Sequence, residues 1–203
     1  MNIIKIIQVV FAAALLFGIS ACGQTPASRF YTLTAQAEVN AESAANKTNK
    51  LIIGIAPIEV APYLERPEIV TRSSPTQIEL AAFDRWAGPF ENIVAESLAE
   101  NISRLLPSVH TIISPWPEAE YEYQLMVKIK KFESDENGVI KLSSSWGILQ
   151  KKTRKMVGTY ESTIIQPGTS SDYDSITRNM SLALVQLSEE IAAELQQVLA
   201  DRM

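Results

Sequence analysis

A single cysteine, Cys22, follows an apolar N-terminal run and limits how this chain is processed and folded. Residues 3–17 are apolar except for two positions, and the short segment 18–21, Gly-Ile-Ser-Ala, leads to the cysteine. This order is typical of a secretory signal, which a peptidase cleaves next to small residues. The run is also shorter than the about 20 apolar residues that a membrane-spanning helix requires. Residues 1–21 are therefore predicted to be a signal peptide that is removed on export.

Cleavage would leave Cys22 as the first residue of the mature chain, where a lipoprotein carries its lipid. We expect an S-diacylglycerol group on its sulfur, an N-acyl group on its amine and no other cofactor. Two or more buried acyl chains give stable membrane attachment. The alternative is a plain secretory signal with an incidental cysteine, which a lone cysteine at the cleavage point disfavours.

The residues around the anchor also predict a location and exclude some partners. Residue 23 is Gly, whereas in enterobacteria-like envelopes Asp at this position is the usual signal for retention in the inner membrane, so the periplasmic face of the outer membrane is predicted. The net charge is −5 and no basic run stands out beyond the short one at 151–155, which argues against nucleic acid as a partner. Without a second cysteine the mature chain forms no internal disulfide, and its fold depends on its apolar core.

The mature chain divides into a tether and one domain. Residues 22–29 are predicted to be a lipidated tether, and residues 30–203 a single periplasmic domain with a flexible insert at about 35–49, where Ala, Asn, Glu, Ser and Thr predominate. Residues 30–34 are strong strand formers. If they form a strand, the tether reaches at most roughly 25 Å at 3.3 to 3.6 Å per residue.

Apolar periodicity predicts mixed α and β structure from residue 51 onward. A continuous apolar run predicts a central strand at 51–56, two shorter runs predict a hairpin, and alternation over 121–130 predicts a strand with one wetted face. With the segments that follow, this strand is expected to form a meander. The predicted hairpin and meander strands are 69–72, 77–81, 139–149 and 156–165.

Two segments have the three-to-four residue spacing of amphipathic helices. One begins near Pro89 and ends before Pro107, and the other covers 176–198 with Asp172 or Asp174 as its N-cap. The predicted class is therefore a layered α/β domain with a mixed β-sheet covered by amphipathic helices.

Three segments together resemble one lipoprotein family. Residues 30–33 read Phe-Tyr-Thr-Leu, residues 61–72 read Ala-Pro-Tyr-Leu-Glu-Arg-Pro-Glu-Ile-Val-Thr-Arg, and residues 85–90 read Arg-Trp-Ala-Gly-Pro-Phe. With the terminal amphipathic helix, their order and spacing resemble the PqiC-type (YmbA-like) lipoproteins, auxiliary components of ABC-type and MCE transport systems. This chain departs from the family at Gly88, where an acidic residue is expected, and at Glu65, where Asp is commoner.

The resemblance implies a non-enzymatic outer-membrane lipoprotein whose periplasmic domain docks an MCE-domain protein. That assembly would bridge the envelope and move phospholipid or related apolar molecules. The implied fold is a layered α/β domain like those of the anticodon-binding type, and self-association into a homo-oligomeric ring is plausible in such families. A second hypothesis remains open: the lipoprotein itself binds lipid or another cell-envelope ligand, which a deep apolar pocket would favour over a shallow docking surface.

Six residues of the two longer segments are candidate partner contacts. Pro62 and Pro67 stiffen the loop between them, which is either a rigid turn or a docking surface that presents aromatic and Arg side chains. Arg85 and Trp86 are expected to start the first helix, and Trp86 is most simply a core lid, a side chain that packs over the sheet and covers the core. The six candidates are Tyr63, Leu64, Arg66, Arg72, Arg85 and Trp86.

No motif indicates an enzyme or a metal site. His110 is the only histidine, and there is no second thiol or histidine to form a metal site or a nucleophile pair with it. Gly-rich phosphate-binding loops are also absent from the sequence. The sequence therefore predicts a binding or docking protein.

Overall fold

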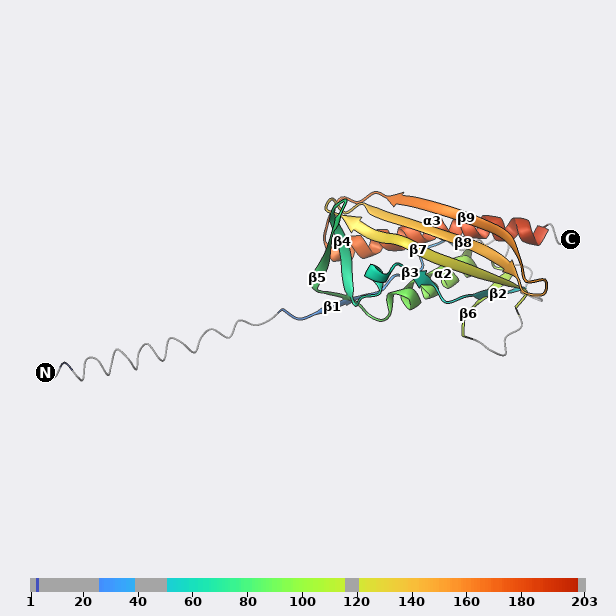
Figure 1. Ribbon diagram of the computed structural model, residues 1–203, viewed down its shortest axis with the longest axis horizontal. Helices are drawn as coiled ribbons and strands as arrows, with labels where there is room; N and C mark the ends of the chain where they lie inside the picture. The colour runs from blue at the N-terminus through green and yellow to red at the C-terminus, as the bar shows by residue number, and fades with distance from the viewer. Residues whose placement is uncertain (1–2, 4–25, 39–50, 116–120, 201–203) are drawn as a thin grey trace.

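The computed structural model describes residues 3, 26–38, 51–115 and 121–200 (Figure 1). Cys22, the predicted signal peptide apart from residue 3, and residues 39–49 of the predicted insert lie outside these ranges. Among the described residues, no helix has the length and apolar character needed to cross a membrane.

Nine strands of the described residues form one mixed sheet, which two helices accompany (Figure 1). This arrangement confirms the predicted layered α/β class. The strands are β1 (Arg29–Tyr31), β2 (Leu51–Ile55), β3 (Glu59–Val60), β4 (Glu68–Ser74), β5 (Gln77–Trp86), β6 (Val109–Ile113), β7 (Tyr123–Asp135), β8 (Ile140–Gln150) and β9 (Lys155–Gln166). The helices are α2 (Phe90–Leu105) and α3 (Tyr173–Ala200), and a 3₁₀ turn, η3, covers Pro62–Leu64.

The predicted meander is confirmed as the antiparallel strands β7, β8 and β9. Val127 of β7 lies opposite Trp146 of β8, which in turn lies opposite Tyr160 of β9. The β7–β8 turn contains Gly138 with φ of 83°, a conformation that glycine adopts without a steric penalty. The alternation over 121–130 therefore predicted the faces of β7 correctly as far as Ile129, and β8 and β9 lie where the two following strands were expected.

The other edge of β7 pairs with three short strands in succession, all parallel to it. Ile55 of β2 lies opposite Leu125, Val60 of β3 opposite Ile129, and Arg72 of β4 opposite Asp135, as the register shows. Beyond these strands, β6 continues the sheet from β2, and β5 and β1 continue it from β4. The predicted central strand and the hairpin of β4 with β5 are both confirmed.

Helices α2 and α3 pack against each other, and α3 lies across β7, β8 and β9. Their apolar positions are buried at helical spacing, as predicted. The side chains of Met126, Lys128 and Lys130 lie on one face of β7 and stay exposed. Lys128 and Lys130 each form an ion pair with a glutamate on this face. The buried helix positions include Phe90, Val94, Leu98 and Ile102 in α2, and Ile176, Met180, Leu184, Leu187 and Ile191 in α3.

Asp172 caps the N-terminus of α3, one of the two predicted caps. Its Oδ1 accepts a hydrogen bond of 2.9 Å from the backbone N–H of Ser175. Hydrogen bonds from Ser170 and Ser175 lower the pKa of Asp172 to about 2. The cap satisfies a backbone donor that the helix leaves without an intrahelical partner.

We expect Asp172→Asn to destabilise the domain above pH 4 and to have little effect near pH 2. A carboxylate whose folded pKa is depressed contributes stability above its unfolded pKa, and this contribution is lost as pH falls through the folded pKa. The measurement is the thermal midpoint of both chains between pH 2 and pH 6. Asp174→Asn is the matched control, because it removes a charge from the same helix end and leaves the Asp172 carboxylate in place. An Asp172→Asn difference that does not shrink toward pH 2 would contradict the assignment.

Candidate functional site

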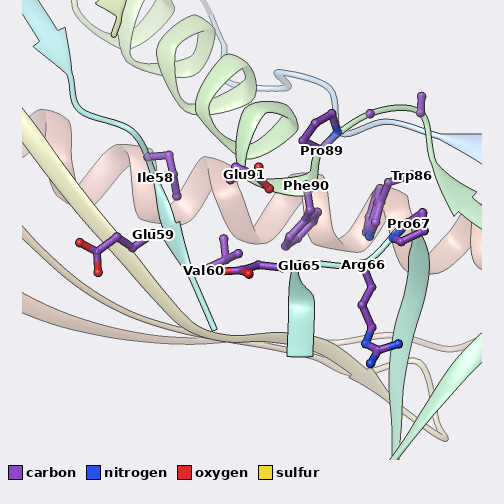
Figure 2. A pocket seen from close by; sticks show the side chains of 12 residues that line it. Ile58, Glu59, Val60, Glu65, Arg66, Pro67, Trp86, Pro89, Phe90 and Glu91 are labelled. Atoms are coloured by element: carbon purple, nitrogen blue, oxygen red, sulfur yellow. The ribbon is translucent and has the colours of Figure 1, made fainter. Parts of the chain in front are cut away.

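A groove of about 670 Å³ lies between the loop after η3, the end of β5 and the start of α2 (Figure 2). Backbone hydrogen bonds hold these segments together: the N–H of Trp86 donates to Pro67 over 2.7 Å, and the N–H of Ala87 donates to Tyr31 of β1 over 2.8 Å. The groove is therefore built from the two sequence segments that suggested a docking surface. It also lies beside β1, the first strand of the described residues.

Aromatic side chains form the floor of this groove. Trp86 is only 5% exposed, and its ring centroid lies 4.7 Å from that of Phe90. Phe90 in turn lies 5.8 Å from Phe132 of β7, so the floor continues into the core. The burial of Trp86 agrees with its expected role as a core lid.

The sequence-based placement of Arg85 and Trp86 at the start of a helix is wrong. Both residues belong to β5, and α2 begins at Phe90. The backbone pairing of Trp86 with Pro67 and of Ala87 with Tyr31 extends the strand, and Gly88 and Pro89 separate it from the helix. Pairing with segments distant in sequence therefore overrides the helical spacing at these positions.

The rim of the groove is charged, with more acidic than basic groups. Glu59, Glu65 and Glu91 line it together with Arg66, whose side chain is exposed (Figure 2). Glu59 is paired with Lys128 at 3.0 Å. An apolar floor with a charged rim is the usual arrangement of a protein-contact surface.

Tyr63 and Arg72 contact Glu133, outside the groove. The Tyr63 hydroxyl donates to Glu133 Oε2 over 2.5 Å, and Arg72 Nε pairs with Glu133 Oε1. Burial, and then the hydrogen bond to Glu133, raise the pKa of the Tyr63 phenol above its ordinary value. The hydrogen bond to Glu133 raises the pKa of Arg72 as well. This cluster fixes η3 against β7, and sequence reasoning missed Glu133.

The alternation of buried and exposed residues along β7 changes phase, which explains why Glu133 was missed. The register shifts between Ile129 and Lys131, and Phe132, Glu133 and Ser134 are then buried in succession. The signal was present in the sequence, because Phe132 falls on the polar phase of the preceding alternation.

The remaining two candidates lie elsewhere. Leu64 is buried in the core, whereas Arg85 lies opposite Glu68 with a charge separation of 3.9 Å. The structure thus brings Arg66 and Trp86 to the groove, and places Tyr63 and Arg72 on Glu133.

The described residues offer little for catalysis. His110 is exposed on β6, and within the described ranges no group of three metal-ligating side chains occurs. Three cavities in these ranges, of about 670, 400 and 720 Å³, all have charged side chains in their linings.

Comparison with known proteins gives a family and a fold. The model of a family described as "ABC-type transport auxiliary lipoprotein component" matches residues 31–192. A crystal structure of an uncharacterized protein aligns with a TM-score of 0.69 at 18% identity, over 84% of this chain and 99% of that chain. A Xanthomonas campestris protein of family DUF330 aligns with a TM-score of 0.66 at 18% identity, over 81% and 92%. At this identity the structures show the fold alone, and no curated protein matches the chain.

Proposed function

Because the chain belongs to the family of ABC-type transport auxiliary lipoprotein components, we propose that it is the outer-membrane docking subunit of such a system. The proposed partner is an MCE-domain protein that bridges the envelope and carries phospholipid or related apolar molecules. In this role the chain holds the assembly at the membrane and catalyses no reaction. The observation that carries the proposal is the family match, which covers residues 31–192.

The position of the groove supports a docking role close to the membrane. Tyr31 of β1 lies opposite Trp86, which forms the groove floor. Strand β1 begins at Arg29, seven peptide units after Cys22, so a lipid on Cys22 would hold this strand within roughly 25 Å of the membrane. A partner in the groove would therefore be held near the outer membrane.

Lengthening the tether tests this docking role. Insertion of a Gly/Ser spacer of about 30 residues after Gln24 is expected to leave folding and lipidation intact, since long surface insertions cost little stability. It should lower the effective concentration of the domain at the membrane and loosen the bridge. We expect resistance to detergents and hydrophobic drugs to fall toward that of a deletion strain at an unchanged protein level. Full complementation by the spacer variant would argue for a freely reaching binding protein.

Arg66 is the groove residue whose removal should affect binding alone. Because its side chain is exposed, Arg66→Ala should leave the thermal midpoint unchanged. Loss of an arginine anchor from a protein contact weakens binding by about 1.4 kcal/mol or more, which is about tenfold in Kd. The measurement is calorimetric titration of the purified MCE-domain partner into each chain. The control is Lys152→Ala, which removes an exposed cation from the β8–β9 turn. Equal partner affinities of the two variants would show that Arg66 does not contact the partner.

The alternative function, direct binding of lipid or another envelope ligand, has one candidate location. A cavity of about 400 Å³ on the open sheet face is lined by Met126 and Met156, with Lys128 and Glu161 among its other lining residues. An enclosed apolar chamber is the usual form of a lipid site, and this cavity has charged groups in its wall. Lipid that copurifies with the chain and is lost in Met126→Glu would favour the alternative.

A further inference from the structure

The outer face of β1 carries an apolar side chain that the fold leaves uncovered. Phe30 is 67% exposed, whereas its two neighbours on the strand both contact the Asp84 carboxylate. Arg29 Nε lies 2.7 Å from Asp84, and the Tyr31 hydroxyl donates to the same carboxylate over 2.9 Å. Because successive side chains of a strand point to opposite faces, these contacts direct Phe30 away from the core.

Two residues of β5 share this outer face with Phe30. Arg85 lies opposite Phe30 in the register, and Phe83, two residues earlier, projects to the same side. Phe83 is half-buried, and in the described part of the chain it does not belong to the core cluster. Arg85 approaches Glu68 only to 3.9 Å, and its side chain is 41% exposed, although its Nε is buried without a hydrogen-bond partner. The patch therefore combines two aromatic rings with an incompletely paired guanidinium.

The chain that precedes this patch indicates what covers it. The described range that contains β1 starts at residue 26, three residues before the strand, and the proposed lipid site Cys22 lies only seven peptide units from Arg29. An anchored chain of this length holds the patch within roughly 25 Å of the membrane. Aromatic side chains are favoured at the boundary of headgroups and acyl chains, and Arg pairs with phosphate through a planar fork.

Resting on the proposed lipid anchor, we infer that Phe30, Phe83 and Arg85 form a contact with the phospholipid surface. The two rings enter the boundary between headgroups and acyl chains, and Arg85 binds headgroup phosphate. The contact orients the domain on the membrane. The turn at 151–154, at the other end of the long axis, then points away from the bilayer (Figure 1).

The lone cysteine of the sequence makes this orientation measurable. In the mature lipoprotein the sulfur of Cys22 is consumed by its lipid, so Phe30→Cys introduces the single reactive thiol. The full lipidated chain, labelled there with an environment-sensitive fluorophore, is reconstituted in vesicles of phosphatidylethanolamine and phosphatidylglycerol. We expect blue-shifted emission and strong quenching by lipids that carry a nitroxide near the headgroup.

Val157→Cys is the matched control. Val157 is apolar and 44% exposed, and it lies on β9 beside the 151–154 turn. Its label should emit as in water and be quenched several-fold less by the nitroxide lipid. Equal quenching at both positions would overturn the inference.

Two further readouts separate the other outcomes. A shielded Phe30 label that lipid nitroxides do not quench, and that becomes exposed when the protein is diluted among vesicles, would assign the patch to a second copy of the chain and overturn the membrane contact. Uptake of label by the wild-type chain would show that Cys22 is free. That result would overturn the proposed anchor, whereas an acylated chain with a water-exposed Phe30 label would overturn only the orientation.

Discussion

Replacement of Glu133 by alanine is expected to lower the free energy of unfolding by about 3 kcal/mol. Glu133 is 3% exposed and accepts bonds from both Tyr63 and Arg72, so its removal leaves two donors without their shared acceptor. Breaking one partner of a buried pair costs about 3 to 5 kcal/mol. The Arg72 side chain is 25% exposed and remains accessible to water, which places the effect at the lower end. Urea unfolding monitored by tryptophan fluorescence measures it.

Glu161→Ala is the control for this effect. Glu161 pairs with Lys130 at 2.7 Å, but its side chain is 74% exposed, and exposed pairs contribute about 1 kcal/mol or less. A double-mutant cycle of Glu133→Ala with Tyr63→Phe then apportions the cost between the two donors. Equal and small effects of Glu133→Ala and Glu161→Ala would show that the cluster does not stabilise η3.

The elements predicted correctly from the sequence are those with a local pattern. Alternation placed β7, turn residues bounded the segments of β8 and β9, and helical spacing placed α2 and α3 to within a few residues. Strand β3 has two residues and no periodicity, so its place beside β7 follows only from the parallel pairing of distant segments. Such pairing leaves no signature in a short window, because it is fixed by packing over the whole sheet.

The same distinction applies to the candidate site. The two segments that form the groove were recognised, and the burial of Trp86 was expected from its size and apolar character. The contacts of Tyr63 and Arg72 with Glu133 join residues 70 and 61 positions apart in the chain, so no local pattern relates them. What sequence reasoning treated as one contact surface is divided in the structure between a groove and an internal cluster.

Replacement of Cys22 by serine is expected to abolish acylation completely. A serine hydroxyl lacks the thiolate that accepts the diacylglyceryl group, so the uncleaved precursor should accumulate. The buried apolar core of the described residues runs from Leu33 to Leu195, and we therefore expect the domain to unfold at the same temperature. Palmitate labelling and membrane fractionation measure the effect, and normal palmitate incorporation by the variant would exclude a lipid on Cys22.

Gly23→Asp separates the lipid itself from the membrane that receives it. Asp after the lipidated cysteine is the usual signal for inner-membrane retention, so this variant should incorporate palmitate normally and fractionate with the inner membrane. If docking at the outer membrane is the function, its strain should be as sensitive to detergents as the Cys22→Ser strain, although its domain is intact and acylated. If this strain instead resists detergents as well as the wild type, acylation in either membrane is sufficient for function. The partner would then meet the domain without the confinement that the short tether imposes.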